Sequence, residues 1–360
     1  MRKKTFWSLI ITILMMMVIG AACGYEPEES VSENNEATSG DDSASEEDDA
    51  AENNESAGDV EEQKLLLGTS SQGGTYYVWG GGWADIMNEN VPEADIGVEV
   101  TGGPTTNIQL IEEKEMELGF VTSWLGGEAH EGIGWTEDKY ENFGAIFPMY
   151  PSVLYLYTLE DNPIDSIGDF AGQHISVGAP GSTSDQAGKI VLDTLDVEPN
   201  KVSSLPTNDA VDNLKDGIVD AGFAVTGVPG PFMLDLETTH NVRHIELNDE
   251  EIDALLEEYP FWSTLDIAAD TYKDLEEDIT HIAFWNFAVA SKDLSDDLVY
   301  DLVKTTFENQ EELINVDPSA KDTLAENIVH SSMPLHPGAY RYYQEEGIDI
   351  PDELIPPEEK

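Results

Sequence analysis

From residue 64 onward the chain repeats one pattern: a short apolar run, a turn rich in Gly, Ser and Thr, and then a helical stretch. The first unit has an apolar run at 65–68, a turn at 69–74 and a predicted helix at 75–90, which ends before Pro92. Apolar runs at 96–100 and 118–121 continue the series around a predicted helix at 107–115. Strands that alternate with helices favour an α/β fold.

A second series of the same kind begins after Pro151. We expect strands at 153–159, 174–177, 221–225 and 282–290, and a strand approach at 241–245. Helices are expected at 165–170, 185–195, 209–216, 249–258 and 272–277, with one long helix over 296–314. The chain has 360 residues, enough for one large core or two modest ones, because single cores stop growing near ~250–300 residues.

Three of the turns share a composition that favours ligand binding. Residues 69–74, 101–106 and 178–184 each join a strand to a helix, and none contains Lys, Arg, Asp or Glu. Free N–H groups at a helix start attract anions, and ligands of open α/β sheets collect at the carboxyl ends of strands. Ordinary capping explains Gly, Ser and Thr at any single turn, but the three turns together favour a binding site.

The charge of the chain excludes some classes of function. It has 74 acidic and 16 basic residues, a net charge of −58, which argues against nucleic-acid binding. Residues 64–360 hold 58 of these acids and 13 of these bases. A single cysteine excludes a disulfide framework and a cysteine-rich zinc site. Neither a metal nor an organic cofactor is expected.

The N-terminus has the pattern of a bacterial lipoprotein leader. Arg2, Lys3 and Lys4 precede an apolar run at 6–19, and small residues lead to Cys23. This predicts a signal peptide at 1–22, lipidation at Cys23 and membrane contact through that lipid, on the outer face of the cytoplasmic membrane. Residues 24–63 contain sixteen acids and no base, which predicts a disordered tether over the remainder of 23–63.

The motifs of the turns resemble one family of receptors. The chain is similar to TAXI-type solute receptors of TRAP transporters at Gly68-Thr69, at 73–77, at 101–103 with Asn107, at 118–121, at 178–182, at 226–229 and at 334–339. The resemblance extends over roughly 64–345. No single motif is specific to this family. The order and spacing of the motifs, together with the lipoprotein leader, are specific to it.

The resemblance implies a two-lobed, hinged receptor of the periplasmic-binding-protein type 2 fold. By analogy, lobe 1 comprises 64–154 and 285–345, lobe 2 comprises 155–284, and 346–360 forms a tail. The lobes would close on a small carboxylate, either a dicarboxylate or a glutamate-like acid. Sodium-coupled membrane subunits of a TRAP transporter would then receive it.

The resemblance also implies a set of ligand-binding residues, carried over by position from the loops and hinge. These are Gly74, Thr75, Tyr76, Gly103, Thr105, Asn107, Thr122, Ser123, Tyr150, Ser182, Ser184 and Thr226. Two positions depart from the family pattern, which often has Gln at Thr122 and Glu at Ser152. An acid in the pocket would suit a ligand ammonium group, so the serine slightly favours a carboxylate without an amine. Trp83 could cover a ligand face or belong to a lobe core.

Two alternatives remain at this stage. An enzyme is disfavoured because no G-x-S-x-G motif occurs and because the Gly188-Lys189 pair lacks the rest of a P-loop. His240 and His244 are four residues apart, but they lie where a strand is expected, so ordinary histidines are favoured over a metal pair. The second alternative keeps the receptor fold but presents the ligand to a membrane sensor.

Overall fold

The structure is a computed structural model that describes residues 62–273 and 275–360. The predicted signal peptide at 1–22, the predicted lipidation site Cys23 and nearly all of the predicted tether lie outside the described residues. The first strand already begins at Gln63, two residues before the expected start. Within the described part of the chain, no helix is long and apolar enough to cross a membrane.

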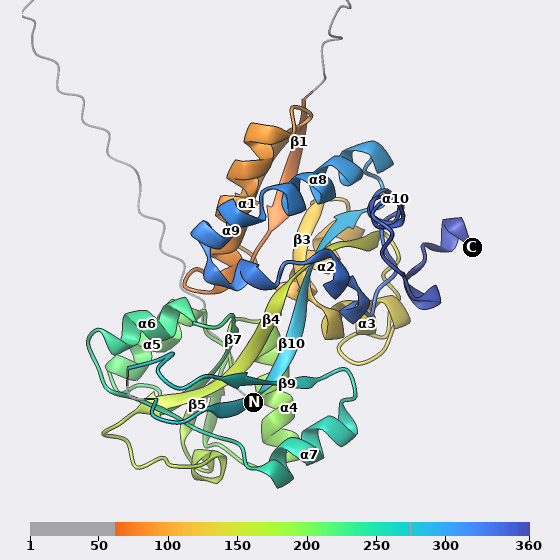
Figure 1. The fold of residues 1–360 in the computed structure, drawn as a ribbon. Coiled ribbons are helices and arrows are strands. Elements are labelled where there is room, and N and C mark those ends of the chain that lie inside the picture. The colour runs from red at the N-terminus through yellow and green to blue at the C-terminus, as the bar shows by residue number, and fades with distance from the viewer. Residues whose placement is uncertain (1–61, 274) are drawn as a thin grey trace, which may run out of the picture. The chain divides into compact units, whose positions relative to one another are not determined.

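The strands form one ten-stranded sheet in the order β2-β1-β3-β10-β4-β7-β5-β6, with β8 on β4 and β9 on β10. Two long strands, β4 (Phe143–Leu159) and β10 (Ile279–Ser291), pair antiparallel and run through both halves of the fold (Figure 1). The parallel strands on one side are β1 (Gln63–Gly68), β2 (Ala94–Glu99) and β3 (Leu118–Thr122). On the other side lie β5 (His174–Ser176), β6 (Lys201–Ser203) and β7 (Ala221–Thr226), while β8 is Val242–His244 and β9 is Ser263–Ile267.

Helices cover the sheet at both ends of the two long strands (Figure 1). The helices of the first half are α1 (Thr75–Asn90), α2 (Pro104–Glu112), α3 (Ser123–Glu131), α8 (Asp296–Glu308), α9 (Gln310–Val316) and α10 (Pro337–Glu345). Those of the second half are α4 (Thr183–Thr194), α5 (Thr207–Lys215), α6 (Pro231–Glu237) and α7 (Asp249–Glu258). Short 3-10 turns are η1 (Ile167–Phe170), η2 (Pro318–Asp322), η3 (Ala325–His330), η4 (Asp352–Leu354) and η5 (Pro357–Glu359).

The buried side chains form one core in the first half and two clusters centred on the second half, one of which also takes Trp124 and Leu125 from helix α3. One core takes Tyr150 and the earlier residues of β4, together with Phe287 and the later residues of β10. Two further clusters take β4 from Val153 onward and β10 up to Phe284. Two lobes are therefore joined by two strands, which confirms the predicted two-lobed α/β fold. The limits given above for each lobe and for the tail remain our proposal.

Three predicted elements were wrong in extent or type. The strand expected at 153–159 is the second half of β4, and Pro148 and Pro151 lie at its irregular register against β10, where a missing N–H is tolerated. The long helix expected at 296–314 breaks at Asn309, whose side chain donates to the Thr305 carbonyl at the end of α8. Among the described residues of 272–277 no helix forms.

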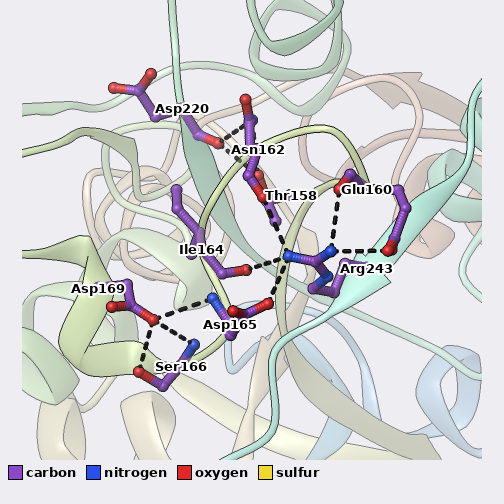
Figure 2. A network of polar contacts seen from close by, with 9 residues as sticks. All are labelled: Thr158, Glu160, Asn162, Ile164, Asp165, Ser166, Asp169, Asp220 and Arg243. Atoms are coloured by element: carbon purple, nitrogen blue, oxygen red, sulfur yellow. Dashed lines mark hydrogen bonds and ion pairs between the residues drawn. The ribbon is translucent and has the colours of Figure 1, made fainter.

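Arg243, on β8, fastens the loop that follows β4 in the second lobe. Its guanidinium donates to the carbonyls of Asn162, Ile164 and Glu160, and to the carboxylates of Asp165 and Glu160 (Figure 2). The planar fork of donors on arginine suits such a set of acceptors. The loop is thus fixed from one side chain.

A candidate ligand site between the lobes

A small cavity of about 40 Å³ lies where the strand-to-helix turns of the two lobes meet. Its lining consists of small polar and aromatic residues from both lobes and from the two connecting strands. They are Ser70, Ser71, Gly74, Thr75, Tyr76, Pro104, Tyr150, Ser152, Ala179, Ser182, Thr183, Ser184, Thr207, Val225, Thr226 and Asn286. None of these described lining residues is Asp, Glu, Lys or Arg, although the chain as a whole is strongly acidic.

Helices of both lobes begin at this cavity, among them α1 and α4. Helix α1 starts after Gly74, which offers no side-chain cap, and α4 starts after Ser182, whose hydroxyl accepts from the Asp185 N–H at 3.1 Å. Both helices follow turns that leave parallel strands at their carboxyl ends. The positive ends of two helix dipoles therefore face the same small space, which favours a ligand that carries negative charge.

Asn286, on β10, organises the inner wall of the cavity. Its amide nitrogen donates to the Tyr150 carbonyl and to the Ser152 hydroxyl, each at 2.7 Å, and its oxygen accepts from the Tyr76 hydroxyl at 2.6 Å. The Tyr150 carbonyl can only accept, so it fixes which end of the amide is nitrogen. The wall is preorganised before any ligand enters.

The Tyr150 hydroxyl lies at the cavity, and its proton has no acceptor among the described residues. The side chain is completely buried. Burial raises the pKa of Tyr150 well above its usual value, and the neighbouring Thr75 hydroxyl opposes that shift. Burial raises the pKa of Tyr76 in the same way. Both phenols therefore remain protonated near neutral pH.

Direct hydrogen bonds join the two lobes around the cavity. The Thr75 and Thr226 hydroxyls share one at 2.8 Å, and the Ser71 and Thr207 hydroxyls share one at 3.2 Å. At the rim the Thr105 hydroxyl donates to the carbonyl of Gly181 at 2.9 Å. The lobes are therefore closed on each other.

Gly181 is needed for this closed contact. Its φ is +84°, and an added Cβ would lie 2.8 Å from the Thr105 hydroxyl. A larger residue would strain the backbone and hold the two loops apart.

Seven of the twelve predicted ligand-binding residues line the cavity: Gly74, Thr75, Tyr76, Tyr150, Ser182, Ser184 and Thr226. The structure places the other five elsewhere. Thr105 makes the rim contact just described, and its neighbour Gly103 lies against Ser182. Asn107 donates to the carbonyls of Gly68, Thr69 and Phe120 and so holds the ends of strands β1 and β3.

The remaining two of the five hold secondary structure together. The Thr122 hydroxyl accepts from the Leu125 N–H and caps helix α3. The Ser123 hydroxyl donates to the His330 carbonyl, on the C-terminal segment that packs against this lobe. A direct role of any of the twelve in ligand binding remains a prediction.

The sequence analysis missed several residues of the lining. Ser152 and Asn286 lie on the two connecting strands, and Thr207 lies at the first turn of helix α5. Asn286 had a usable signal, because it is the only amide in an otherwise apolar run and a buried amide needs partners. Ser152 had been noted only as a departure from the family pattern.

Other residues discussed from sequence lie away from the cavity. Trp83 belongs to the core of the first lobe, and its indole N–H donates to the Thr306 hydroxyl. His336 caps helix α10 by accepting from the Gly338 N–H. His240 contacts the hydroxyl of Thr239, whereas the His244 side chain is buried beside Glu237. Within 62–273 and 275–360 no cluster of three His, Cys, Asp or Glu side chains could hold a metal ion.

The solved structures to which this chain is similar are distant from it in sequence. MatC from Rhodopseudomonas palustris, solved with bound malate, is 12% identical, with a TM-score of 0.53 over 79% of this chain and 96% of its own. A protein described as a periplasmic transporter is also 12% identical, with a TM-score of 0.47 over 78% of this chain and 92% of its own. A structure from work on glutathione import and the cystine importer TcyBC of Streptococcus mutans is 14% identical, with a TM-score of 0.45 over 73% of this chain and 97% of its own.

The strand order of the first lobe, 2-1-3 followed by the returning strand β10 and then β4, agrees with the periplasmic-binding-protein type 2 fold. This confirms the predicted fold class. The family match extends over residues 67–347, which contain every residue of the cavity lining. The chain belongs to the NMT1-like family.

Proposed function

We propose that this chain is an extracytoplasmic solute receptor of a transporter and that it holds a small organic acid between its two lobes. The observation that supports this best is the closed, polar, uncharged cavity at the meeting point of two helix starts. A closed cavity removes a ligand from water, and fixed N–H and O–H dipoles then bind a carboxylate more strongly than they would in solution.

The finer assignment follows from the motifs. We propose a TAXI-type receptor that delivers its ligand to the sodium-coupled membrane subunits of a TRAP transporter. Dicarboxylates and glutamate-like acids are the ligand classes implied by the resemblance, and malate in MatC is an acid of this general kind. The role proposed is binding and delivery, with no chemical change of the ligand.

We also propose that Cys23 carries a lipid that holds the receptor on the outer face of the cytoplasmic membrane, with the acidic stretch before residue 64 as a tether. Cys23→Ser should release the receptor from the membrane fraction of the native cell while leaving its folded body intact. Retention of the variant in the membrane fraction, at the level of the unaltered chain, would contradict a lipid anchor at this residue.

A thermal-shift panel of the full chain tests the receptor function. Dicarboxylates, oxo acids, amino acids and sugar acids are each added to the purified chain, after denaturation and mass spectrometry of one aliquot for a ligand retained from the cell. A ligand at 100 times its Kd should add about 2.7 kcal/mol to the free energy of unfolding. A folded, ligand-free sample that responds to no acid in the panel would contradict the proposed function.

A further inference from the structure

Three serine hydroxyls on residues that line the cavity each already accept one hydrogen bond from the protein. The Ser152 oxygen accepts from the Asn286 amide, the Ser182 oxygen from the Asp185 N–H at 3.1 Å, and the Ser184 oxygen from the Val225 N–H at 2.7 Å. A serine hydroxyl has one proton to donate, and these three protons have no acceptor among the described residues.

The threonine pair also accepts hydrogen bonds from the protein. The Thr226 hydroxyl accepts from the Thr75 N–H, and the Thr75 hydroxyl accepts from the Gly227 N–H, each at 3.2 Å. The two hydroxyls share a single hydrogen bond at 2.8 Å, which uses one of their two protons. The other proton has the neighbouring Tyr150 oxygen as an acceptor, so the pair is not counted among the free donors.

Tyr150 adds a fourth donor. Its side chain is buried on a residue that lines the cavity, and the hydroxyl proton has no acceptor among the described residues. Four O–H protons, from Ser152, Ser182, Ser184 and Tyr150, therefore border one small space. A buried donor that loses water and finds no acceptor is costly, so the closed form gains most from a ligand that supplies acceptors.

Two carboxylates near these residues, those of Asp185 and Asp317, do not supply acceptors to the cavity wall. Asp185 follows Ser182, but its carboxylate is held by Lys189 and by the Ser204 hydroxyl. Asp317, which is also buried, accepts from the Ser319 N–H. Neither residue is part of the cavity lining. A ligand ammonium group would bring donors and positive charge to a space whose lining holds no carboxylate to meet them, which is unfavourable.

We infer that the cavity selects a small carboxylate that carries no ammonium group, because its wall offers hydroxyl protons and no carboxylate. This rests on the proposed receptor function and narrows its ligand to acids without an amine, against the glutamate-like class. The cavity of about 40 Å³ is small, so the shortest acids fit with the least separation of the lobes.

Three pairs of ligands that differ mainly in the amine test this inference: pyruvate with alanine, succinate with aspartate, and 2-oxoglutarate with glutamate. Each is titrated calorimetrically into the full chain at neutral pH. In each pair that binds, the acid without the amine should bind about 100-fold more tightly, as expected when a charged donor is buried without a partner.

Tyr150→Phe tests the wall itself. It removes one donor and keeps the ring, so affinity for the preferred acid should fall about tenfold. Tyr343→Phe is the matched control: that side chain is also fully buried in the first lobe, but its hydroxyl donates to the Ile146 carbonyl and it is not among the residues that line the cavity. It should change thermal stability and leave affinity unaltered.

The outcomes separate the two proposals. If the amino acids bind as tightly as their partners, or more tightly, the receptor function stands and the selection against ammonium is wrong. The same conclusion follows if Tyr150→Phe retains full affinity while the control behaves as expected. If neither member of any pair binds to a folded, ligand-free chain at millimolar concentration, the receptor function for small acids fails and this inference fails with it.

Discussion

Single buried histidines give the folded chain a dependence on pH. His336 caps helix α10 through one ring nitrogen, and its other ring nitrogen has no partner among the described residues. Burial lowers the pKa of His336 to about 4. The pKa values of His244 and His281 are also lowered by burial to about 4. All three are therefore neutral in the folded chain near pH 7.

Because the folded pKa is below the unfolded value of about 6.5, protonation favours the unfolded chain. Stability should therefore fall as pH drops from about 6.5 to about 4, by about 3 kcal/mol for each histidine at most. His336→Asn keeps an acceptor for the Gly338 N–H and removes the titration. The variant should lose about 3 kcal/mol less over that range, measured by urea unfolding at several pH values.

The comparison uses the slope of the free energy of unfolding against pH. The absolute stability is not compared, because the smaller side chain also leaves some empty volume. Equal slopes for the variant and the unaltered chain would show that His336 titrates normally when folded. The same experiment on His240→Asn gives a control, because that residue is half-buried and its ring contacts only a neighbouring hydroxyl.

At the scale of elements, β8 is a three-residue strand whose Arg243 fixes the loop after β4 (Figure 2). The Arg243 side chain is 24% exposed, so the two carbonyls at Asn162 and Ile164 depend on it more than on water. Thr158 and Asn162 also donate to the Asp220 carbonyl and extend the same network. The Arg243 side chain thus supplies hydrogen bonds to a loop that has no regular strand pairing.

Arg243→Lys should destabilise the chain by about 2 kcal/mol, because an ammonium group cannot serve the carbonyls and carboxylates of this loop together. Urea unfolding at neutral pH measures this. Arg341→Lys is the control: its guanidinium meets Asp297 at an exposed position, where a pair contributes about 0.2–1 kcal/mol. Equal losses for the two variants would contradict the role given to Arg243.

The sequence predicted elements well where their patterns were local. Helices α1 and α7 have the expected bounds, and the turn residues at the helix starts were identified. The sequence did not predict the full length of β4, because its two prolines usually interrupt a strand. Only the register against β10 shows that they lie where the pairing is irregular. The prediction also failed for Ser152 and Asn286, since only the pairing of two distant strands brings them together beside Tyr76. Contacts between segments far apart in the chain cannot be predicted from local patterns, although the single amide of Asn286 in an apolar run was a usable signal.

At the scale of the whole molecule, the proposed receptor function depends on the balance between open and closed lobes. A ligand shifts this balance only if it binds the closed form better. Thr105 is not part of the cavity lining, but it favours the closed form, because its hydroxyl donates to the Gly181 carbonyl of the other lobe.

Thr105→Val should therefore raise the Kd of the preferred acid about fivefold, the effect of losing one hydrogen bond of about 1 kcal/mol from the closed form. Calorimetry measures the change. Thr106→Val is a close control, because this neighbour lies on the same helix turn and its hydroxyl also lies against Gly181, but only Thr105 donates a side-chain hydrogen bond to the Gly181 carbonyl among the described residues. A fivefold loss in both variants would point to altered packing of α2 instead of a lost contact between lobes.

The most direct test of the central claim is to trap a ligand between the lobes. The Ser71 and Thr207 hydroxyl oxygens are 3.2 Å apart, so Ser71→Cys with Thr207→Cys should form a disulfide across the cavity rim in a Cys23→Ser background. The reduced variant is loaded with a radiolabelled acid from the thermal-shift panel, oxidised and dialysed. We predict that the label stays bound until a reductant is added. Loss of label at the same rate before and after cross-linking would contradict a ligand site enclosed by the two lobes.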